Sequence, residues 1–91
     1  MKLSDKERII CGLLAQEGEL YGLQLVELGD GALARGTVYV TLGRMIDKGL
    51  VSARRDRETH PGLPRPRYRL TALGLKLLHA ERAFARAMGE A

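Results

Sequence analysis

Residues 50–70, LVSARRDRETHPGLPRPRYRL, constrain the fold more than any other part of this chain, because they cannot form a helix while the segments on both sides can. Pro61, Gly62 and Pro64 exclude a helix in the middle of the segment. The flanking stretches contain β-branched or aromatic residues in partial alternation. This pattern predicts a β-hairpin with a projecting tip that is stiffened by proline.

The same segment carries the charge surplus of the chain. The net charge is +4, and residues 50–70 contain six arginines against two acidic residues, while the rest of the chain is nearly balanced. Alternation in RPRYRL places Arg65, Arg67 and Arg69 on one side of the strand. Arginine is a planar, bidentate donor suited to phosphate and to base edges, so the hairpin is a candidate anion-binding surface. A merely solubilising surface is the alternative.

The first helix is predicted from its N-terminal capping signal. Ser4 followed three residues later by Glu7 forms a capping box, and the helix is expected to end near Gly18. Its apolar stripe consists of Ile9, Ile10, Leu13 and Leu14.

A second, short helix is predicted in YGLQLVELG, residues 21–29, with Tyr21, Leu25 and Leu28 on one side. The glycine-rich stretch GDGAL, residues 29–33, breaks this helix and supplies a tight reversal of the chain.

A third helix is predicted from about residue 35 to residue 48, with Gly49 as its C-terminal stop. Helical spacing sorts its side chains onto two faces. The inward face holds Val38, Leu42, Met45 and Ile46. The outward face holds Thr37, Thr41, Arg44 and Lys48, with Gly36 and Val40 beside its first turns. Short side chains, hydroxyls and bases suit a helix that enters the major groove of DNA, whereas an ordinary solvated helix face is the alternative.

A fourth helix is predicted from a cap at Thr71 to about Met88. Its apolar residues recur at alternating steps of three and four, which forms a seam for another helix. The seam consists of Leu70, Leu73, Leu77, Ala80, Phe84 and Ala87, and further apolar surface comes from Leu75, Leu78, Ala85 and Met88. A core of this size cannot cover both surfaces, so we expect a homodimer through the first and last helices, with burial inside one monomer as the alternative. The expected interface residues are Ile9, Leu13, Leu73, Leu77, Ala80, Phe84 and Met88.

The order helix, helix, helix, β-hairpin, helix predicts a mainly α fold with an α+β wing, the winged helix-turn-helix. The chain is expected to form one domain over residues 1–91, with a DNA-binding core at 1–70, a wing at about 50–70 and a dimerisation helix at 71–88.

Two motifs also resemble a known family. GTVYVTLGRMIDKGLV and RYRLTALG are similar to signatures of the PadR family of transcriptional regulators, in its short-tailed branch. The resemblance implies that Gly36, Thr37 and Tyr39 open the recognition helix and that a palindromic DNA operator is the partner. It also implies a repressor. A small hydrophobic effector near Leu77, Phe84 and Met88 would follow from the resemblance, but the sequence shows no pocket. Because the chain has no tryptophan and one phenylalanine, an effector-free regulator is the alternative.

The predicted DNA-contacting residues combine these lines of reasoning. They are Arg35, Gly36, Thr37, Tyr39, Val40, Thr41, Arg44, Lys48, Arg54, Arg55, Arg65 and Arg67.

Other kinds of chemistry find little support in the sequence. The spacing of Gly29, Gly31 and Ala34 imitates a nucleotide-binding loop, but no strand precedes it. Cys11, His60 and His79 are too scattered for a metal site, and no nucleophile has a base partner. We therefore expect no enzyme activity, no cofactor and no metal.

The sequence also predicts where the protein is located and which class of function it has. A single cysteine and the absence of an apolar leader or membrane span predict a cytoplasmic protein. A sequence-specific transcriptional regulator is the preferred function. A winged-helix module for protein–protein interaction and a nonspecific DNA-binding protein are the alternatives.

Overall fold

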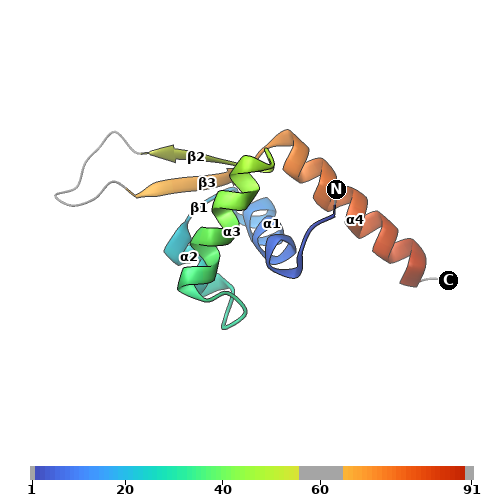
Figure 1. Ribbon diagram of the computed structural model, residues 1–91. Coiled ribbons are helices and arrows are strands. Elements are labelled where there is room, and N and C mark those ends of the chain that lie inside the picture. The colour runs from blue at the N-terminus through green and yellow to red at the C-terminus, as the bar shows by residue number, and fades with distance from the viewer. Residues whose placement is uncertain (1, 56–64, 90–91) are drawn as a thin grey trace.

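The computed structural model describes residues 2–55 and 65–89, and these form four helices and a three-stranded antiparallel sheet (Figure 1). The elements, in chain order, are α1 Asp5–Glu17, β1 Glu19–Tyr21, α2 Gly22–Leu28, α3 Arg35–Asp47, β2 Val51–Arg55, β3 Pro66–Leu70 and α4 Ala72–Gly89. This arrangement confirms the predicted winged helix-turn-helix. The proline-containing tip expected at residues 58–64 lies outside the described residues.

Helix α1 begins with the predicted capping box. The Glu7 amide donates to Ser4 Oγ over 3.2 Å, and the Ser4 amide donates to Glu7 Oε1 over 2.8 Å. The helix ends where Gly18 adopts a φ of 91°, a conformation that favours glycine. Ile10 and Leu14 of the expected stripe are buried in the core, while Ile9 and Leu13 are half-buried against it.

Strand β1 was not predicted from the sequence, and the predicted start of the second helix at Tyr21 is wrong. Tyr21 closes this strand, and α2 starts at Gly22. The sheet order is β1-β3-β2, so β3 pairs with β2 in the predicted hairpin and with β1 on its other edge. Leu20 lies opposite Tyr68, and both side chains are buried. A three-residue strand shows too little alternation to be recognised locally, and it forms because β3 offers a free edge.

The turn between α2 and α3 has the expected tight geometry. Asp30 and Gly31 both have positive φ values, 47° and 88°. Leu33 follows and is buried, which anchors the turn to the core. Leu25 of α2 is also buried, whereas Leu28, which was expected on the same side of the helix, is 45% exposed. Leu28 is the last residue of α2, where the chain already turns away from the core.

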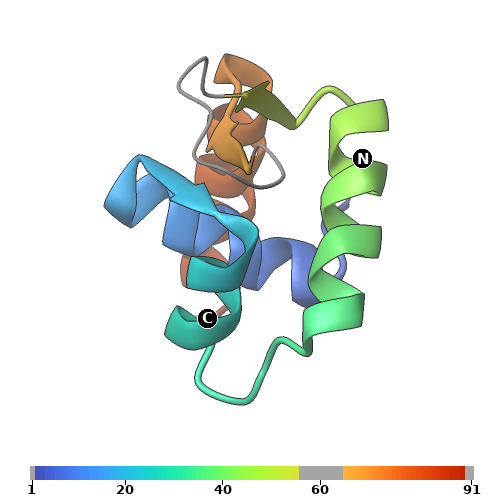
Figure 2. The ribbon, with the colours of Figure 1, turned by 90° about the vertical axis from the view of Figure 1, so that its left-hand side faces the viewer.

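Helix α3 packs Val38, Leu42 and Met45 into the core, as predicted. Ile46 is 40% exposed, so its assignment to the same stripe is wrong. It directly follows the buried Met45 and therefore points to a different side of the helix. Gly49 has a φ of 77° and allows the chain to leave the helix for β2. Figure 2 looks along the hairpin, with α3 on the right and the α2–α3 turn at the bottom.

Helix α4 starts at the predicted cap. The Gly74 amide donates to Thr71 Oγ1 over 3.0 Å, and Thr71 Oγ1 donates to the Gly49 carbonyl oxygen over 2.6 Å. Leu78 is buried in the core, which corrects its assignment to extra surface outside the seam. From residue 82 to residue 89 every side chain is exposed, and this half of α4 extends away from the other elements (Figure 1). None of the described helices combines the length and hydrophobicity that a bilayer-spanning segment requires.

Candidate nucleic-acid interface

The outer surface of α3 presents small, hydroxyl-bearing and basic side chains. Its exposed residues include six of the predicted DNA contacts, namely Arg35, Gly36, Thr37, Tyr39, Val40 and Arg44. Val40 is 56% exposed and Tyr39 is 43% exposed, so both side chains are accessible to a partner. No acidic residue occurs in the first turn of α3. Apolar groups are therefore displayed on α3 together with one basic group in the first turn, Arg35, and one in the last turn, Arg44.

Thr41 does not belong to this surface, and its predicted outward position is wrong. Thr41 is only 7% exposed, and it lies with Val38 and Leu42 on the buried side of α3. Thr41 is four residues after the exposed Thr37 but also three residues after the buried Val38. Thr41 therefore lies at the border between an exposed and a buried stripe of the helix. Packing against the core places its side chain on the buried side.

Tyr39 is positioned by α2 through a glycine. A Cβ atom built on Gly22 would lie 2.6 Å from Tyr39 Cε1 and 2.8 Å from the Tyr39 hydroxyl oxygen. The ring of Tyr39 therefore rests against the backbone of Gly22, at a distance that only glycine permits. This contact joins the two helices of the helix-turn-helix and fixes where the tyrosine side chain is presented.

Lys48 is directed to α1. Its Nζ lies 2.7 Å from Glu7 Oε2, and the Glu7 side chain is only 4% exposed. Burial alone would raise the pKa of Glu7, but the Lys48 ammonium and the hydrogen bonds at Ser4 together hold that pKa below its ordinary value. Lys48 thus neutralises a buried carboxylate and links the end of α3 to the start of α1.

Arg54, Arg67 and Arg69 of the hairpin lie on one face of the sheet, as the strand register shows. Ser52 is opposite Arg69, which is opposite Glu19, while Arg54 is opposite Arg67, which is opposite Tyr21. Because side chains alternate along a strand, these six residues share one face. The opposite face includes the buried Leu20, Val51 and Tyr68 and packs on the helices.

Two arginines of this face contact β1. Arg54 Nε and Nη2 lie 3.2 and 3.1 Å from the two carboxylate oxygens of Glu19. Arg67 Nε donates to the Tyr21 hydroxyl over 3.0 Å, and its guanidinium carbon lies 5.0 Å from the centre of the Tyr21 ring. Arg55 and Arg65 are exposed near the outer end of the hairpin stem.

Sequence reasoning missed Glu19, Tyr21 and Gly22 as members of this region. Glu19 and Tyr21 act through β1, which the sequence does not reveal. Gly22 lies in LYGLQL, residues 20–25, a third segment that is similar to the family's pattern L-x-G-Y-E-[IL] at the second helix, although Leu23 stands where a tyrosine is usual. Its role beside Tyr39 became apparent only from the packing of α2 on α3.

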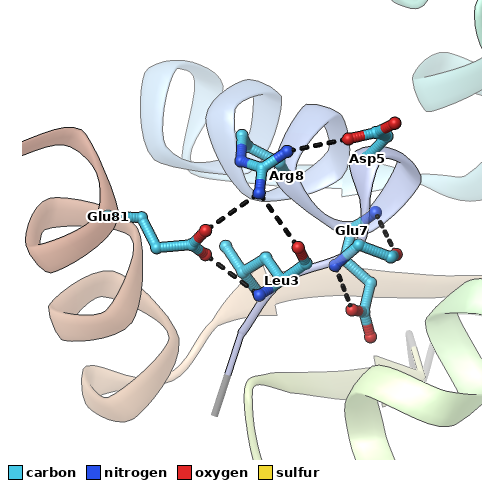
Figure 3. Close-up of polar contacts among 6 residues, drawn as sticks. Leu3, Asp5, Glu7, Arg8 and Glu81 are labelled. Carbon is cyan, nitrogen blue, oxygen red and sulfur yellow. Dashed lines mark hydrogen bonds and ion pairs between the residues drawn. The ribbon is translucent and has the colours of Figure 1, made fainter. Parts of the chain in front are cut away.

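A second polar cluster attaches α4 to the N-terminal segment (Figure 3). Glu81 accepts from the Leu3 amide over 3.0 Å and from Arg8 Nη2 over 2.9 Å. Arg8 also donates to the Leu3 carbonyl and to Asp5. Burial alone would raise the pKa of Glu81, but its hydrogen bonds with Arg8 and Leu3 outweigh that effect and lower the pKa. The middle of α4 is therefore held on α1.

The residues predicted to form a dimer interface lie in two groups. Leu73, Phe84 and Met88 are 50%, 68% and 61% exposed. Ala80 is also exposed, and Leu77 is half-buried. Ile9 and Leu13 contact the core from α1, and each keeps a partly exposed side chain. Exposed apolar atoms are thus present on both α1 and α4.

The free cysteine is part of the core. Cys11 is fully buried, and burial raises the pKa of its thiol to about 11. Such a thiol is inert at neutral pH. Among residues 2–55 and 65–89, no group of His, Cys, Asp and Glu is arranged to hold a metal ion.

A helix-turn-helix followed by an arginine-bearing hairpin defines the winged-helix class. The family model of the transcriptional regulator PadR-like family matches residues 10–80. The chain therefore belongs to the PadR-like family of transcriptional regulators, as the resemblance implied. No curated protein matches the chain.

Solved structures of the family have the same fold. A PadR family transcription regulator from Clostridium difficile R20291 has a TM-score of 0.82 at 24% identity, over 96% of this chain and 93% of that one. A PadR-like transcription factor from Bacteroides fragilis has a TM-score of 0.83 at 29% identity, over 92% and 82%. PadR of Bacillus subtilis, solved in complex with operator DNA, has a TM-score of 0.72 at 25% identity, over 81% of this chain. This chain covers only 44% of the Bacillus protein.

Proposed function

We propose that this protein is a homodimeric transcriptional repressor that reads DNA with α3 and contacts the phosphate backbone or minor groove with the β2–β3 hairpin. The observation that carries the proposal is the exposed face of α3, where Thr37, Val40 and Arg44 are displayed without an acidic residue in the first turn. Base-edge contacts need such short polar, apolar and guanidinium groups on a helix that can approach closely. The operator complex of the Bacillus subtilis relative supports the assignment.

The candidate contacts divide into two roles in this proposal. Residues of α3 read bases, and these are Arg35, Gly36, Thr37, Tyr39, Val40 and Arg44. The hairpin arginines Arg54, Arg55, Arg65 and Arg67 bind phosphate or the minor groove, which supplies affinity with little sequence information. Lys48 is left out because it is paired with Glu7, and Thr41 is left out because it is buried.

Dimerisation is proposed through the apolar surface of α1 and α4. The side chains of residues 82–89 in α4 are exposed, and Phe84 and Met88 are among them. A two-fold axis at this surface would place two α3 helices about 34 Å apart, one turn of DNA, and would match a palindromic operator. Light scattering is expected to give the mass of a dimer at micromolar concentration, and a monomer would contradict this part.

Further parts of the proposal depend on the dimer. Residues 1–70 would act as the DNA-binding core and residues 71–88 as the dimerisation helix of one domain. A small hydrophobic effector would bind between the two subunits near Leu77, Phe84 and Met88.

The cytoplasm is the expected location, because the operator must be accessible.

The test of the function is selection of duplexes from random sequence by the purified protein at physiological salt, with competitor DNA. Enrichment of a palindrome with half-sites about one helical turn apart is expected. Weak, salt-sensitive binding without enrichment would instead indicate a nonspecific DNA-binding protein. Binding that does not depend on salt would indicate a module for protein interaction.

A further inference from the structure

We propose that Glu19 limits the DNA affinity of this protein by occupying Arg54. The inference rests on the proposed DNA-binding function and adds to it a residue that lowers affinity. Its basis is the outer face of the sheet, where β1 brings one carboxylate beside the guanidinium groups of Arg54, Arg67 and Arg69.

The contact between the two groups is bidentate. Both carboxylate oxygens of Glu19 are used, and Arg54 offers its Nε and Nη2. This is the geometry that arginine also uses to bind phosphate. A phosphate can reach those two donors only after Glu19 has released them.

The carboxylate is the fixed partner in this pair. The Glu19 side chain is 27% exposed and belongs to a strand that is paired with the central strand of the sheet. The Arg54 side chain is 64% exposed and lies near the outer end of the described hairpin stem, where the hairpin is proposed to meet DNA. Arg54 can therefore turn toward a phosphate, whereas Glu19 stays on the same sheet face.

In the DNA complex, Arg54 can either stay on Glu19 or move to a phosphate, and in both cases Glu19 lowers the affinity for DNA. If Arg54 stays on Glu19, the carboxylate neutralises its guanidinium. Arg54 then contacts no phosphate and releases no counterion from DNA. If Arg54 moves to a phosphate, Glu19 loses its bidentate partner, and its negative charge repels phosphates that lie within about one Debye length, roughly 8–10 Å. Removing the charge of Glu19 thus strengthens binding in either case.

The pair itself contributes little to folding, since exposed ion pairs have small net stabilising effects. Glu19→Gln keeps the size of the side chain and its ability to accept hydrogen bonds, so the variant is expected to fold. Glu19→Ala serves as a second variant, and circular dichroism with thermal melting checks that both fold.

The experiment measures dissociation constants for the selected duplex and for a scrambled duplex of the same composition, over a series of salt concentrations. Glu19→Gln should bind both duplexes more tightly, by roughly threefold or more at low salt. If Arg54 stays on Glu19 in the wild-type complex, the salt slope should also become steeper by about one phosphate contact per subunit. The matched control is Glu17→Gln, which removes the same charge two residues earlier, from an exposed side chain at the end of α1. Its effect should be clearly smaller.

A second comparison tests the route through Arg54. In an Arg54→Gln background, Glu19→Gln should give a reduced gain, because the guanidinium that Glu19 holds in the bidentate contact is gone. An undiminished gain would overturn the role of Arg54.

The outcomes separate this inference from the proposed function. If the wild-type protein binds DNA and Glu19→Gln binds no more tightly than Glu17→Gln, the inference fails and the function stands. Weaker binding by Glu19→Gln also overturns it, since Glu19 would then help to position Arg54. If neither wild-type nor variant binds any duplex, both proposals fail.

Discussion

Replacing Gly74 by alanine should destabilise the fold, although alanine is the better helix former. Gly74 is buried in the first turn of α4. A Cβ atom at this position would lie 2.2 Å from the Leu50 carbonyl oxygen and 3.0 Å from Leu70 Cδ2. The Leu50 carbonyl cannot move freely, because it accepts a hydrogen bond of 3.0 Å from the Thr71 amide.

The magnitude follows from three contributions. Alanine for glycine inside a helix normally stabilises by about 1 kcal/mol. Overpacking of a buried site costs about 1–3 kcal/mol. Displacing the Leu50 carbonyl from Thr71 costs a further ~1 kcal/mol. We therefore expect the free energy of unfolding to fall by about 1–3 kcal/mol in Gly74→Ala.

The assay is urea unfolding followed by circular dichroism, at one fixed protein concentration because a dimer makes stability depend on concentration. Gly43→Ala is the matched control, since Gly43 is exposed in α3 and a Cβ there would meet no atom within 4 Å. That variant should be stabilised by about 0.5–1 kcal/mol. A Gly74→Ala protein as stable as the wild type would refute the steric reasoning.

Three further predictions concern the buried carboxylate, the placement of Tyr39 and the proposed dimer. Because the folded pKa of Glu7 is lowered, its contribution to stability is fully present above the ordinary value of 4.5 and is lost as the pH falls through the lowered pKa. Urea midpoints measured against pH should therefore decline in acid, and less steeply in Glu7→Gln. Gly22→Ala should push the Tyr39 ring from its site and weaken DNA binding about as much as Tyr39→Ala does, and unchanged affinity in a binding titration would argue against the contact. Phe84→Asp places a charge on the exposed apolar surface of α4, so light scattering should show a monomer.

The helices could be predicted from the sequence because their signals are local. The capping box at Ser4, the glycine stop at Gly49 and the cap at Thr71 each depend on residues a few positions apart. The apolar period of α3 likewise placed Val38 and Met45 in the core. The structure differs from prediction where a second element decides the outcome.

Long-range contacts account for the parts of the site that the sequence did not reveal. Strand β1 exists because β3 offers it an edge, and α2, α3 and β2 all lie between the two strands in the sequence. Lys48 appears as an outward base in the sequence, but its partner Glu7 lies 41 positions away. Thr41 lies at the border of two helical stripes, so only the shape of the core could decide its side. Each case depends on tertiary packing, which periodicity does not report.

The start of α4 connects the proposed dimer surface directly to the proposed DNA-reading helix. Thr71 Oγ1 bonds the Gly49 carbonyl just after α3, and the Thr71 amide bonds the Leu50 carbonyl just before β2. Farther along, Glu81 fixes the middle of α4 to Leu3 and Arg8. With two separate attachments, α4 cannot rotate about either one without breaking the other. In the proposed dimer, the separation of the two α3 helices would then be set by these contacts, so Gly74→Ala should relax the preference for half-site spacing as well as lower stability.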